Sequence, residues 1–329
     1  MTALLTVRRL TTTFSTPRGN ARAVDDVSFD LAAGETLAIV GESGSGKTVT
    51  ALSILKLVAA PGRIAPESRI EYQGRDILTL PAEELRRVRG GEIGMVFQEP
   101  STSLNPVLTV GYQIAETVSA HRDVDRAAAK ARAVEMMKLV GIPDADERYA
   151  SYPHQLSGGM KQRIMIAIAL SCEPKILIAD EPTTALDVTI QAQILELLAE
   201  LKQRLGLAVL LISHDLGVVA GMADRVAVMY GARIVEQAAT TEIFRSPRHP
   251  YTEGLLQAAP RVDRPQPVLA AIPGSVPPAT AWPSGCRFHP RCRHAWDRCT
   301  REEPGLLAAG HAHASRCWLV EEPQRRRAP

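Results

Sequence analysis

A glycine-rich turn between an apolar run and a helical pattern constrains this chain more than any other stretch. The turn, GESGSGKT at residues 41–48, directly follows the apolar residues 36–40. A strand that ends in such a turn and enters a helix directs several backbone N–H groups and the positive end of the helix dipole at one small volume. The spacing GxxGxGK[ST] is that of a phosphate-binding P-loop. We therefore predict a nucleoside triphosphate site in an α/β fold, in preference to a chance turn of glycine and serine.

The residue types in this turn match the chemistry of a triphosphate. Glycine lets the backbone approach a phosphate because it has no Cβ. In a P-loop the lysine reaches the β- and γ-phosphates, and the hydroxyl group that follows it holds Mg²⁺. The predicted nucleotide-binding residues are Gly41, Ser43, Gly44, Ser45, Gly46, Lys47 and Thr48, with Thr48 as a Mg²⁺ ligand.

Length and composition limit the other possibilities. At 329 residues the chain is long enough for one large domain or two smaller ones. A net charge of +2 and an aromatic content of 4% argue against nucleic acid as a partner. No apolar run approaches the ~18 residues that a membrane helix needs, and the first residues lack the pattern of a secretory signal. We expect a protein that stays in the cytoplasm.

Polar side chains follow three other apolar runs. Gln98, the pair Asp180 and Glu181, and His214 each end a short run that is typical of a buried parallel strand. Because α/β sheets bind ligands at the carboxyl ends of their strands, we expect these side chains near the phosphates. Asp180 suits a Mg²⁺ ion and Glu181 an attacking water. Alone, Gln98 is weak evidence, His214 could be a satisfied polar residue, and the acids could be solvated; the P-loop in the same chain favours the functional interpretation.

Helical periodicity dominates residues 101–170. Asp125 is expected to cap one of these helices, and Gly141 to end it. Gly206 is expected to end a later helix, and Gly231 to join two strands as a hairpin.

Two helix starts and one aromatic residue complete the candidates. Ser157 is expected to cap a helix whose first turn contains Gly158 and Gly159. The N–H groups of such a start attract an anion, although a plain cap is the simpler explanation. Asp187 is expected to cap the later helix that ends at Gly206. Phe14 lies in a predicted loop, where it could stack on a base, although a single Phe is more often part of a core.

Taken together, these motifs resemble those of a known family. With the P-loop, Gln98, LSGG at 156–159, Asp180 with Glu181, and His214 in that order, the chain resembles the nucleotide-binding subunits of ABC transporters over residues 1 to about 258. The resemblance implies a P-loop NTPase ABC ATPase core with an antiparallel β subdomain and a helical subdomain at about residues 100–172. It also implies ATP and Mg²⁺ as ligands.

The same resemblance implies a role for each candidate. Phe14 would stack on adenine, Gln98 would contact Mg²⁺ or water and sense the membrane subunits, Asp180 would support Mg²⁺, Glu181 would be the general base and His214 would contact the γ-phosphate. Ser157, Gly158 and Gly159 would bind the γ-phosphate of ATP held by an opposite subunit, and Asp187 would lie on that shared surface.

Finer features resemble the D-type ATPase of oligopeptide and dipeptide importers. They are FQEPSTSLNP at 97–106, Met160 after LSGG, HPYT at 249–252, and a tail with IPGSVP and GCRFHPRC. This resemblance implies a different F-type ATPase as partner, two permeases, an extracytoplasmic binding protein and a peripheral place on the cytoplasmic face of the inner membrane. Nickel, glutathione or another small solute stay open as alternatives to peptides. A soluble ABC ATPase acting on DNA or ribosomes would need a long coiled coil or a second cassette, which the sequence lacks.

The remaining candidates are cysteines in a C-terminal extension at residues 259–329, which begins with a proline-rich connector. Cys286, Cys292, Cys299 and Cys317 lie there, whereas Cys172 is expected to be a buried small hydrophobe. Because disulfides are disfavoured in the cytoplasm, metal ligation is the better interpretation. The resemblance implies a [4Fe-4S] cluster. Zinc and plain reduced cysteines are the alternatives, with His289, His294, His311 or His313 available as further zinc ligands.

Overall fold

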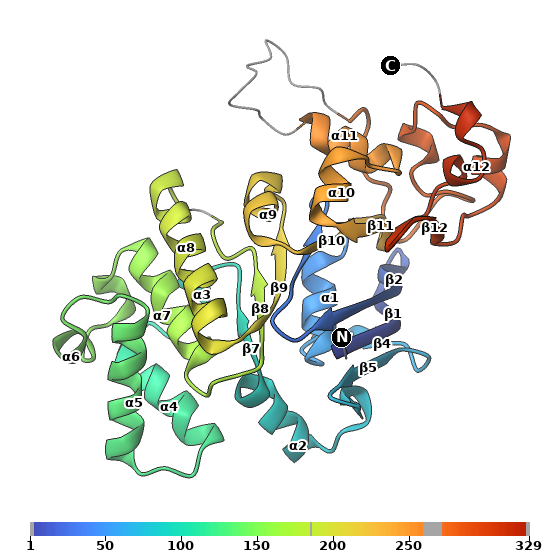
Figure 1. Ribbon diagram of the computed structural model, residues 1–329. Coiled ribbons are helices and arrows are strands. Elements are labelled where there is room, and N and C mark those ends of the chain that lie inside the picture. Colours follow the sequence, from blue (N-terminus) through green and yellow to red (C-terminus); the bar gives the residue numbers. More distant parts are fainter. Residues whose placement is uncertain (1–2, 185, 259–271, 327–329) are drawn as a thin grey trace. The chain divides into compact units, whose positions relative to one another are not determined.

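The computed structural model describes residues 3–184, 186–258 and 272–326, which fall into two compact units (Figure 1). The first unit consists chiefly of residues 79–212, with the short segment 32–35. The second unit contains residues 3–31 and 36–78 and the chain from Ser213 onward.

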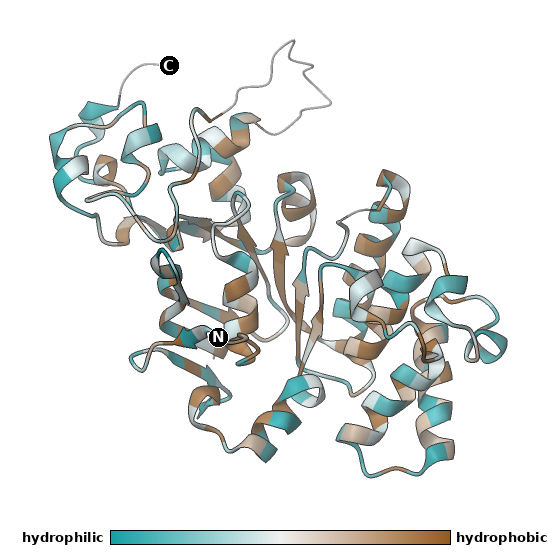
Figure 2. Cartoon of the chain, turned by 180° about the vertical axis from the view of Figure 1, so that it is seen from behind, coloured by the Kyte–Doolittle hydropathy of each residue, from teal (hydrophilic) through white to brown (hydrophobic). Residues whose placement is uncertain are grey.

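The first unit is built on a short parallel sheet. Strand β8 (Ile176–Asp180) pairs in parallel with β7 (Ile93–Val96) on one side and with β9 (Ala208–Ser213) on the other. Every residue of β8 and β9 is buried, and these strands appear brown in Figure 2. Their continuous apolar pattern therefore has the cause that the sequence predicted, burial on both faces of a parallel sheet.

Helices form the rest of the first unit, as the periodicity predicted. They are α2 (Ala82–Arg87), α3 (Pro100–Ser103), α4 (Val110–His121), α5 (Arg126–Leu139), α6 (Ala145–Arg148), α7 (Gly158–Leu170) and α8 (Val188–Leu205). The predicted caps are confirmed: Asp125 accepts from the N–H of Ala128 at 2.7 Å, and Gly206 ends α8 in the left-handed conformation.

The second unit contains a mixed sheet. Strand β3 (Thr36–Val40) pairs in parallel with β10 (Arg225–Tyr230), which forms the predicted hairpin with β11 (Arg233–Ala239). The C-terminal part of the chain continues this sheet, because β13 (His313–Ser315) pairs with β11 and β12 (Leu307–Gly310) pairs with β13.

The second unit also contains an antiparallel sheet. Its long strands are β1 (Ala3–Thr16) and β2 (Gly19–Ala32), with β4 (Gly62–Ile64), β5 (Arg69–Tyr72) and β6 (Arg75–Asp76) alongside. The prediction of a loop around Phe14 is wrong: Phe14 lies within β1, opposite Gly62. The polar residues 11–16 looked like a loop, but threonine is β-branched and favours strands.

The helices of the second unit are short. They are α1 (Lys47–Ile54), α9 (Leu216–Met222), α10 (Thr240–Arg245), α11 (Pro250–Ala258) and α12 (Asp297–Arg301). The first half of the predicted proline-rich connector, residues 260–271, lies outside the described residues. None of the helices in the described part of the chain combines the length and hydrophobicity needed to cross a bilayer.

Candidate nucleotide-binding site

The predicted P-loop joins β3 to α1 in the second unit. Close packing within the protein requires glycine at two of its positions, Gly41 and Gly46. Gly46 has a φ of 105°, and a Cβ at this position would lie 2.2 Å from the carbonyl oxygen of Ala23. A Cβ at Gly41 would lie 2.1 Å from the carbonyl oxygen of Met229. Both positions therefore exclude any side chain.

The lysine of the loop is buried and bonded to the loop itself. Lys47 is 5% exposed, and its Nζ donates to the carbonyl oxygens of Gly41 at 2.9 Å and Glu42 at 3.1 Å. An ammonium group that is surrounded by the loop's backbone is placed to meet a phosphate at the same site.

A carboxylate network occupies the carboxyl end of β8 in the first unit. Asp180 ends the strand and is 2% exposed. Glu181 follows with a φ of 47°, a strained conformation for a residue other than glycine. Its Oε2 accepts hydrogen bonds from Gln98 Nε2 at 3.0 Å and from Thr184 Oγ1 at 2.9 Å. The structure thus brings Gln98 and Glu181 together, and it adds Thr184, which no sequence motif singled out.

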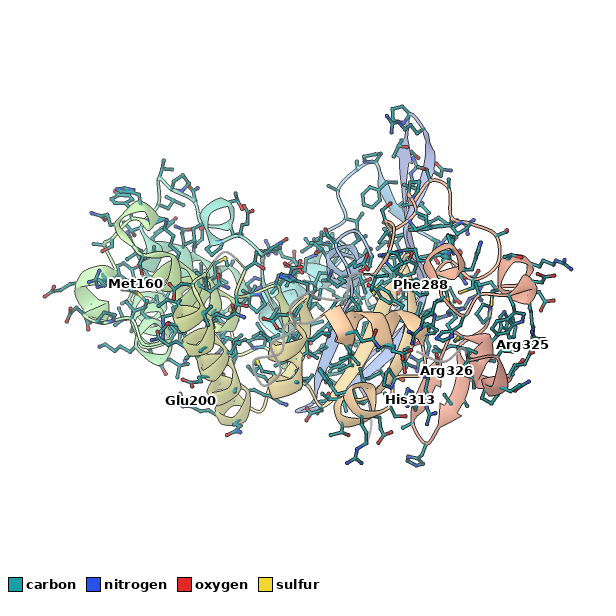
Figure 3. All side chains as sticks on the ribbon, turned by 90° about the horizontal axis from the view of Figure 1, so that it is seen from above. Met160, Glu200, Phe288, His313, Arg325 and Arg326 are labelled. Atoms are coloured by element: carbon teal, nitrogen blue, oxygen red, sulfur yellow. The ribbon has the colours of Figure 1, made fainter. Side chains whose placement is uncertain are left out.

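The start of α7 lies against the start of α8, also in the first unit. Ser157 caps α7, as predicted, by accepting from the N–H of Met160 at 3.3 Å, and Met160 is labelled in Figure 3. A Cβ at Gly159 would lie 2.7 Å from Cγ2 of Ile190. Asp187 caps α8 by accepting from the N–H of that same Ile190 at 2.9 Å. The two predicted caps therefore lie in one neighbourhood.

The predicted nucleotide site draws on both units. Phe14, the P-loop and His214 belong to the second unit, whereas Gln98, Asp180 and Glu181 belong to the first, as do Ser157, Gly158, Gly159 and Asp187. His214 is exposed and precedes α9, whose N-cap is the next residue, Asp215. The assembly of these residues around one nucleotide stays a prediction.

The four C-terminal cysteines line a single cavity in the second unit. Cys286, Cys292, Cys299 and Cys317 share it with His289 and His294, among other residues. Burial raises the pKa of the Cys286 thiol to about 12. Across the three described ranges, no group of three or more His, Cys, Asp or Glu side chains could hold a metal ion.

Two further expectations about side chains can be compared with the structure. Cys172 is 5% exposed, which confirms it as a buried hydrophobe. His313, one of the possible zinc ligands, instead pairs with the buried Glu236, its Nε2 lying 2.7 Å from Oε1.

The sequence of this chain is similar to those of known transport proteins. A family model described as "ABC transporter" matches residues 24–184. The oligopeptide transport ATP-binding protein AppD of Bacillus subtilis is 50% identical over 322 residues, 98% of each chain. The dipeptide transport ATP-binding protein DppD of Escherichia coli is 48% identical over 315 residues, 96% of each chain. The chain belongs to the oligopeptide and dipeptide transport ATP-binding proteins, a family of ABC transporters.

Two more comparisons agree with this family. The model "Oligopeptide/dipeptide transporter, C-terminal region" matches residues 235–299. Among solved structures, a dimeric ATP-binding cassette, MJ0796, bound to ADP and Pi is 27% identical with a TM-score of 0.64, and the alignment covers 72% of this chain and 98% of that one. The predicted family and the ABC ATPase fold are confirmed, and this ABC transporter ATPase hydrolyses ATP.

The HPYT motif of this oligopeptide and dipeptide family lies in a buried polar cluster. The N–H of His249 donates to Oε2 of the buried Glu236 at 3.0 Å, and the N–H of Tyr251 donates to His249 Nδ1 at 3.1 Å. Burial lowers the pKa of His249 from 6.5 to about 4, against the attraction of Glu236. Arg316 is the other charged group that influences this imidazole.

A pH dependence of stability follows from His249. As the pH falls below 6.5, His249 of the unfolded chain takes up a proton, whereas the buried His249 of the folded chain stays neutral. The free energy of unfolding therefore decreases until the pH reaches about 4. At ~1.4 kcal/mol per pKa unit, we expect a loss of about 2 kcal/mol between pH 7 and pH 5. Denaturant unfolding of His249→Asn, which cannot titrate, should show a loss smaller by that amount. Equal losses in both proteins would contradict the assignment.

Proposed function

We propose that this ATPase is the motor subunit of an importer for oligopeptides or dipeptides. The observation that supports it is the extent of the match, because identity of about half holds over both the ATPase region and the C-terminal region of relatives named for peptide transport. In this proposal residues 1–258 form the ATPase domain and residues 259–329 the extension. Nickel, glutathione and other small solutes are the competing cargoes.

Each predicted residue has a part in the proposed reaction. Phosphoryl transfer needs positioning and charge stabilisation more than covalent chemistry. The P-loop binds the phosphates, Phe14 stacks on adenine, and His214 contacts the γ-phosphate. Mg²⁺ would be held by Thr48, Gln98 and Asp180 and would neutralise phosphate charge. Glu181, whose Oε2 already accepts from two neutral donors, orients the attacking water and accepts its proton.

The second half of the site comes from a partner. In this proposal Ser157, Gly158 and Gly159 present the N–H groups at the start of α7 to the ATP held by another ATPase subunit. Asp187 lies beside that contact, followed by Val188, whose side chain is 83% exposed. An apolar side chain exposed to this extent suits a protein interface.

The partners in this proposal are an F-type ATPase, two permeases and an extracytoplasmic binding protein. The complex would place this chain on the cytoplasmic face of the inner membrane. Docking to the permeases is supported by apolar side chains that are exposed on the first unit, namely Phe97, Val107, Tyr112 and Tyr152. Phe97 immediately precedes Gln98. A permease that binds Phe97 would therefore also affect the position of Gln98, which donates to Glu181.

Transport in reconstituted vesicles tests the proposed cargo. The chain is co-purified with its membrane subunits, and ATP-driven uptake of labelled dipeptides and longer peptides is compared with uptake of nickel and glutathione. We expect uptake of peptides that is abolished by Lys47→Ala. Uptake of nickel or glutathione without peptides would overturn the peptide cargo and leave the motor intact.

We further propose that the C-terminal cysteines hold a [4Fe-4S] cluster. The donor set fits, because four thiols face one cavity and Cys thiolates are the usual ligands of such clusters. When bound, the cluster would supply a covalent link between the four cysteines.

Iron analysis tests the cluster directly. Protein purified without oxygen should contain about four iron atoms and four acid-labile sulfides per chain. Cys299→Ser should lose most of the iron, whereas Cys172→Ser, a buried cysteine elsewhere, should keep it. Protein that is purified without oxygen and contains neither iron nor sulfide would refute the cluster. Colourless protein that contains zinc would indicate a zinc site in place of the cluster.

A further inference from the structure

The second residue of the P-loop is held by the C-terminal half of the chain. The backbone N–H of Glu42 donates to the hydroxyl oxygen of Tyr251 at 2.8 Å. Its carboxylate accepts two hydrogen bonds from Arg291, Nη1 to Oε2 at 2.9 Å and Nη2 to Oε1 at 3.2 Å. Its carbonyl oxygen accepts from Lys47. Three groups therefore fix one residue of the phosphate loop.

Arg291 is itself held rigidly. Its side chain is 5% exposed, and its Nε donates to the carbonyl oxygen of Pro273 at 2.8 Å. The guanidinium lies over the rings of Tyr230 and Phe288, 5.7 and 5.9 Å from their centroids, and Phe288 is labelled in Figure 3. Although burial opposes it, the hydrogen bond with Glu42 raises the pKa of Arg291. A planar fork in such surroundings aims both donors at the carboxylate.

A second arginine of the same segment reaches the loop through one intermediate. Nη1 of Arg287 donates to the carbonyl oxygen of Gly231. The next residue, Ala232, donates its N–H to the carbonyl oxygen of Ser45 at 3.1 Å. Arg287 is also paired with the buried Asp25. The segment that carries Cys286 and Cys292 thus contacts the loop directly at Glu42 and indirectly at Ser45.

We propose that Arg291 is a positioning residue for the P-loop, so that the C-terminal extension sets the affinity of this ATPase for ATP. The inference rests on the proposed function in one respect, that the loop binds ATP. Arg291 does two things there: it fixes the geometry of Glu42, and it balances a carboxylate that would otherwise repel a triphosphate. Tyr251 completes the restraint through the backbone.

Calorimetric titration of the full chain with MgATP tests this role. Arg291→Ala should raise the Kd for MgATP about tenfold, because a charge-assisted, two-bond contact is lost and the acid is left unbalanced. Arg291→Lys keeps the charge but not the fork and should give a smaller rise. The double variant Glu42→Gln with Arg291→Ala should recover part of the affinity, since the repulsion is removed. The turnover rate at saturating ATP should stay near that of the wild type.

Arg293→Ala is the matched control. Arg293 lies two residues further on, is half exposed and pairs with Glu253 instead of the loop, so this variant should keep the Kd of the wild type. An unchanged Kd in a folded Arg291→Ala protein would overturn the proposal. If Arg291→Ala does not fold, the single variants Arg291→Lys and Tyr251→Phe take its place. An unchanged Kd for MgATP in both of them would overturn the proposal. Wild-type protein that binds no MgATP would instead refute the P-loop as the nucleotide site.

Discussion

Glu181→Gln retains bound ATP and loses turnover by about 10³-fold, the range expected when a general base is removed. The substitution keeps the shape of the side chain and an oxygen that can accept from Gln98 and Thr184, which now donate to Glu181 Oε2. It removes only the charge and the basicity. Single-turnover hydrolysis measures the rate, and equilibrium titration measures the retained ATP.

Glu99→Gln is the matched control for this experiment. Glu99 is an exposed acid that directly follows Gln98, so the same change of charge there should leave the rate within about twofold, as surface changes generally do. Hydrolysis by Glu181→Gln at the rate of the wild type would remove Glu181 from the catalytic role. Loss of ATP binding in this variant would indicate that the carboxylate supports the nucleotide instead of the water.

The parts of the site that sequence could predict are those that local chemistry determines. The P-loop, the cap at Ser157 and the strand that ends at Asp180 each depend on residues within one turn or one strand. Their patterns are therefore complete in a short stretch of sequence. The error at Phe14 is also local, because polar composition outweighed the strand preference of threonine.

The contacts that Arg291 and Tyr251 make with Glu42 of the P-loop could not be predicted from such short patterns. Glu42 and Arg291 are 249 positions apart, and Glu42 and Tyr251 are 209 apart. An arginine next to a cysteine looks like part of a metal-binding segment, and nothing in its neighbours tells which acid it meets. Only the fold of the second unit brings these residues together. Thr184 could not be predicted for a related reason. Its hydroxyl donates to Glu181, which adopts a left-handed backbone conformation that no short sequence pattern indicates.

Gly158→Asp should bind ATP as the wild type does and yet lose at least about 10² in turnover within the complete complex, the usual cost of removing one preorganised donor for an anion. In the proposed arrangement the start of α7 meets the γ-phosphate of ATP on the partner subunit. A carboxylate at that point repels the phosphate and prevents the closed state, although it leaves the chain's own P-loop untouched.

The structure makes this variant a clean test of a shared site. Gly158 is exposed, and among the described residues a Cβ there would meet only Cδ2 of Leu186 at 3.5 Å, an ordinary contact. A negative charge in the first turn of a helix interacts favourably with the helix dipole. We therefore do not expect unfolding to cause a loss of turnover in this variant. Gly158→Ala adds the same Cβ without charge and should keep most of the turnover, whereas Gly159 could not serve because Ile190 lies too close. Equal turnover in the aspartate and alanine variants would show that no phosphate approaches α7, and the proposed contribution of this helix to a partner's ATP would be lost.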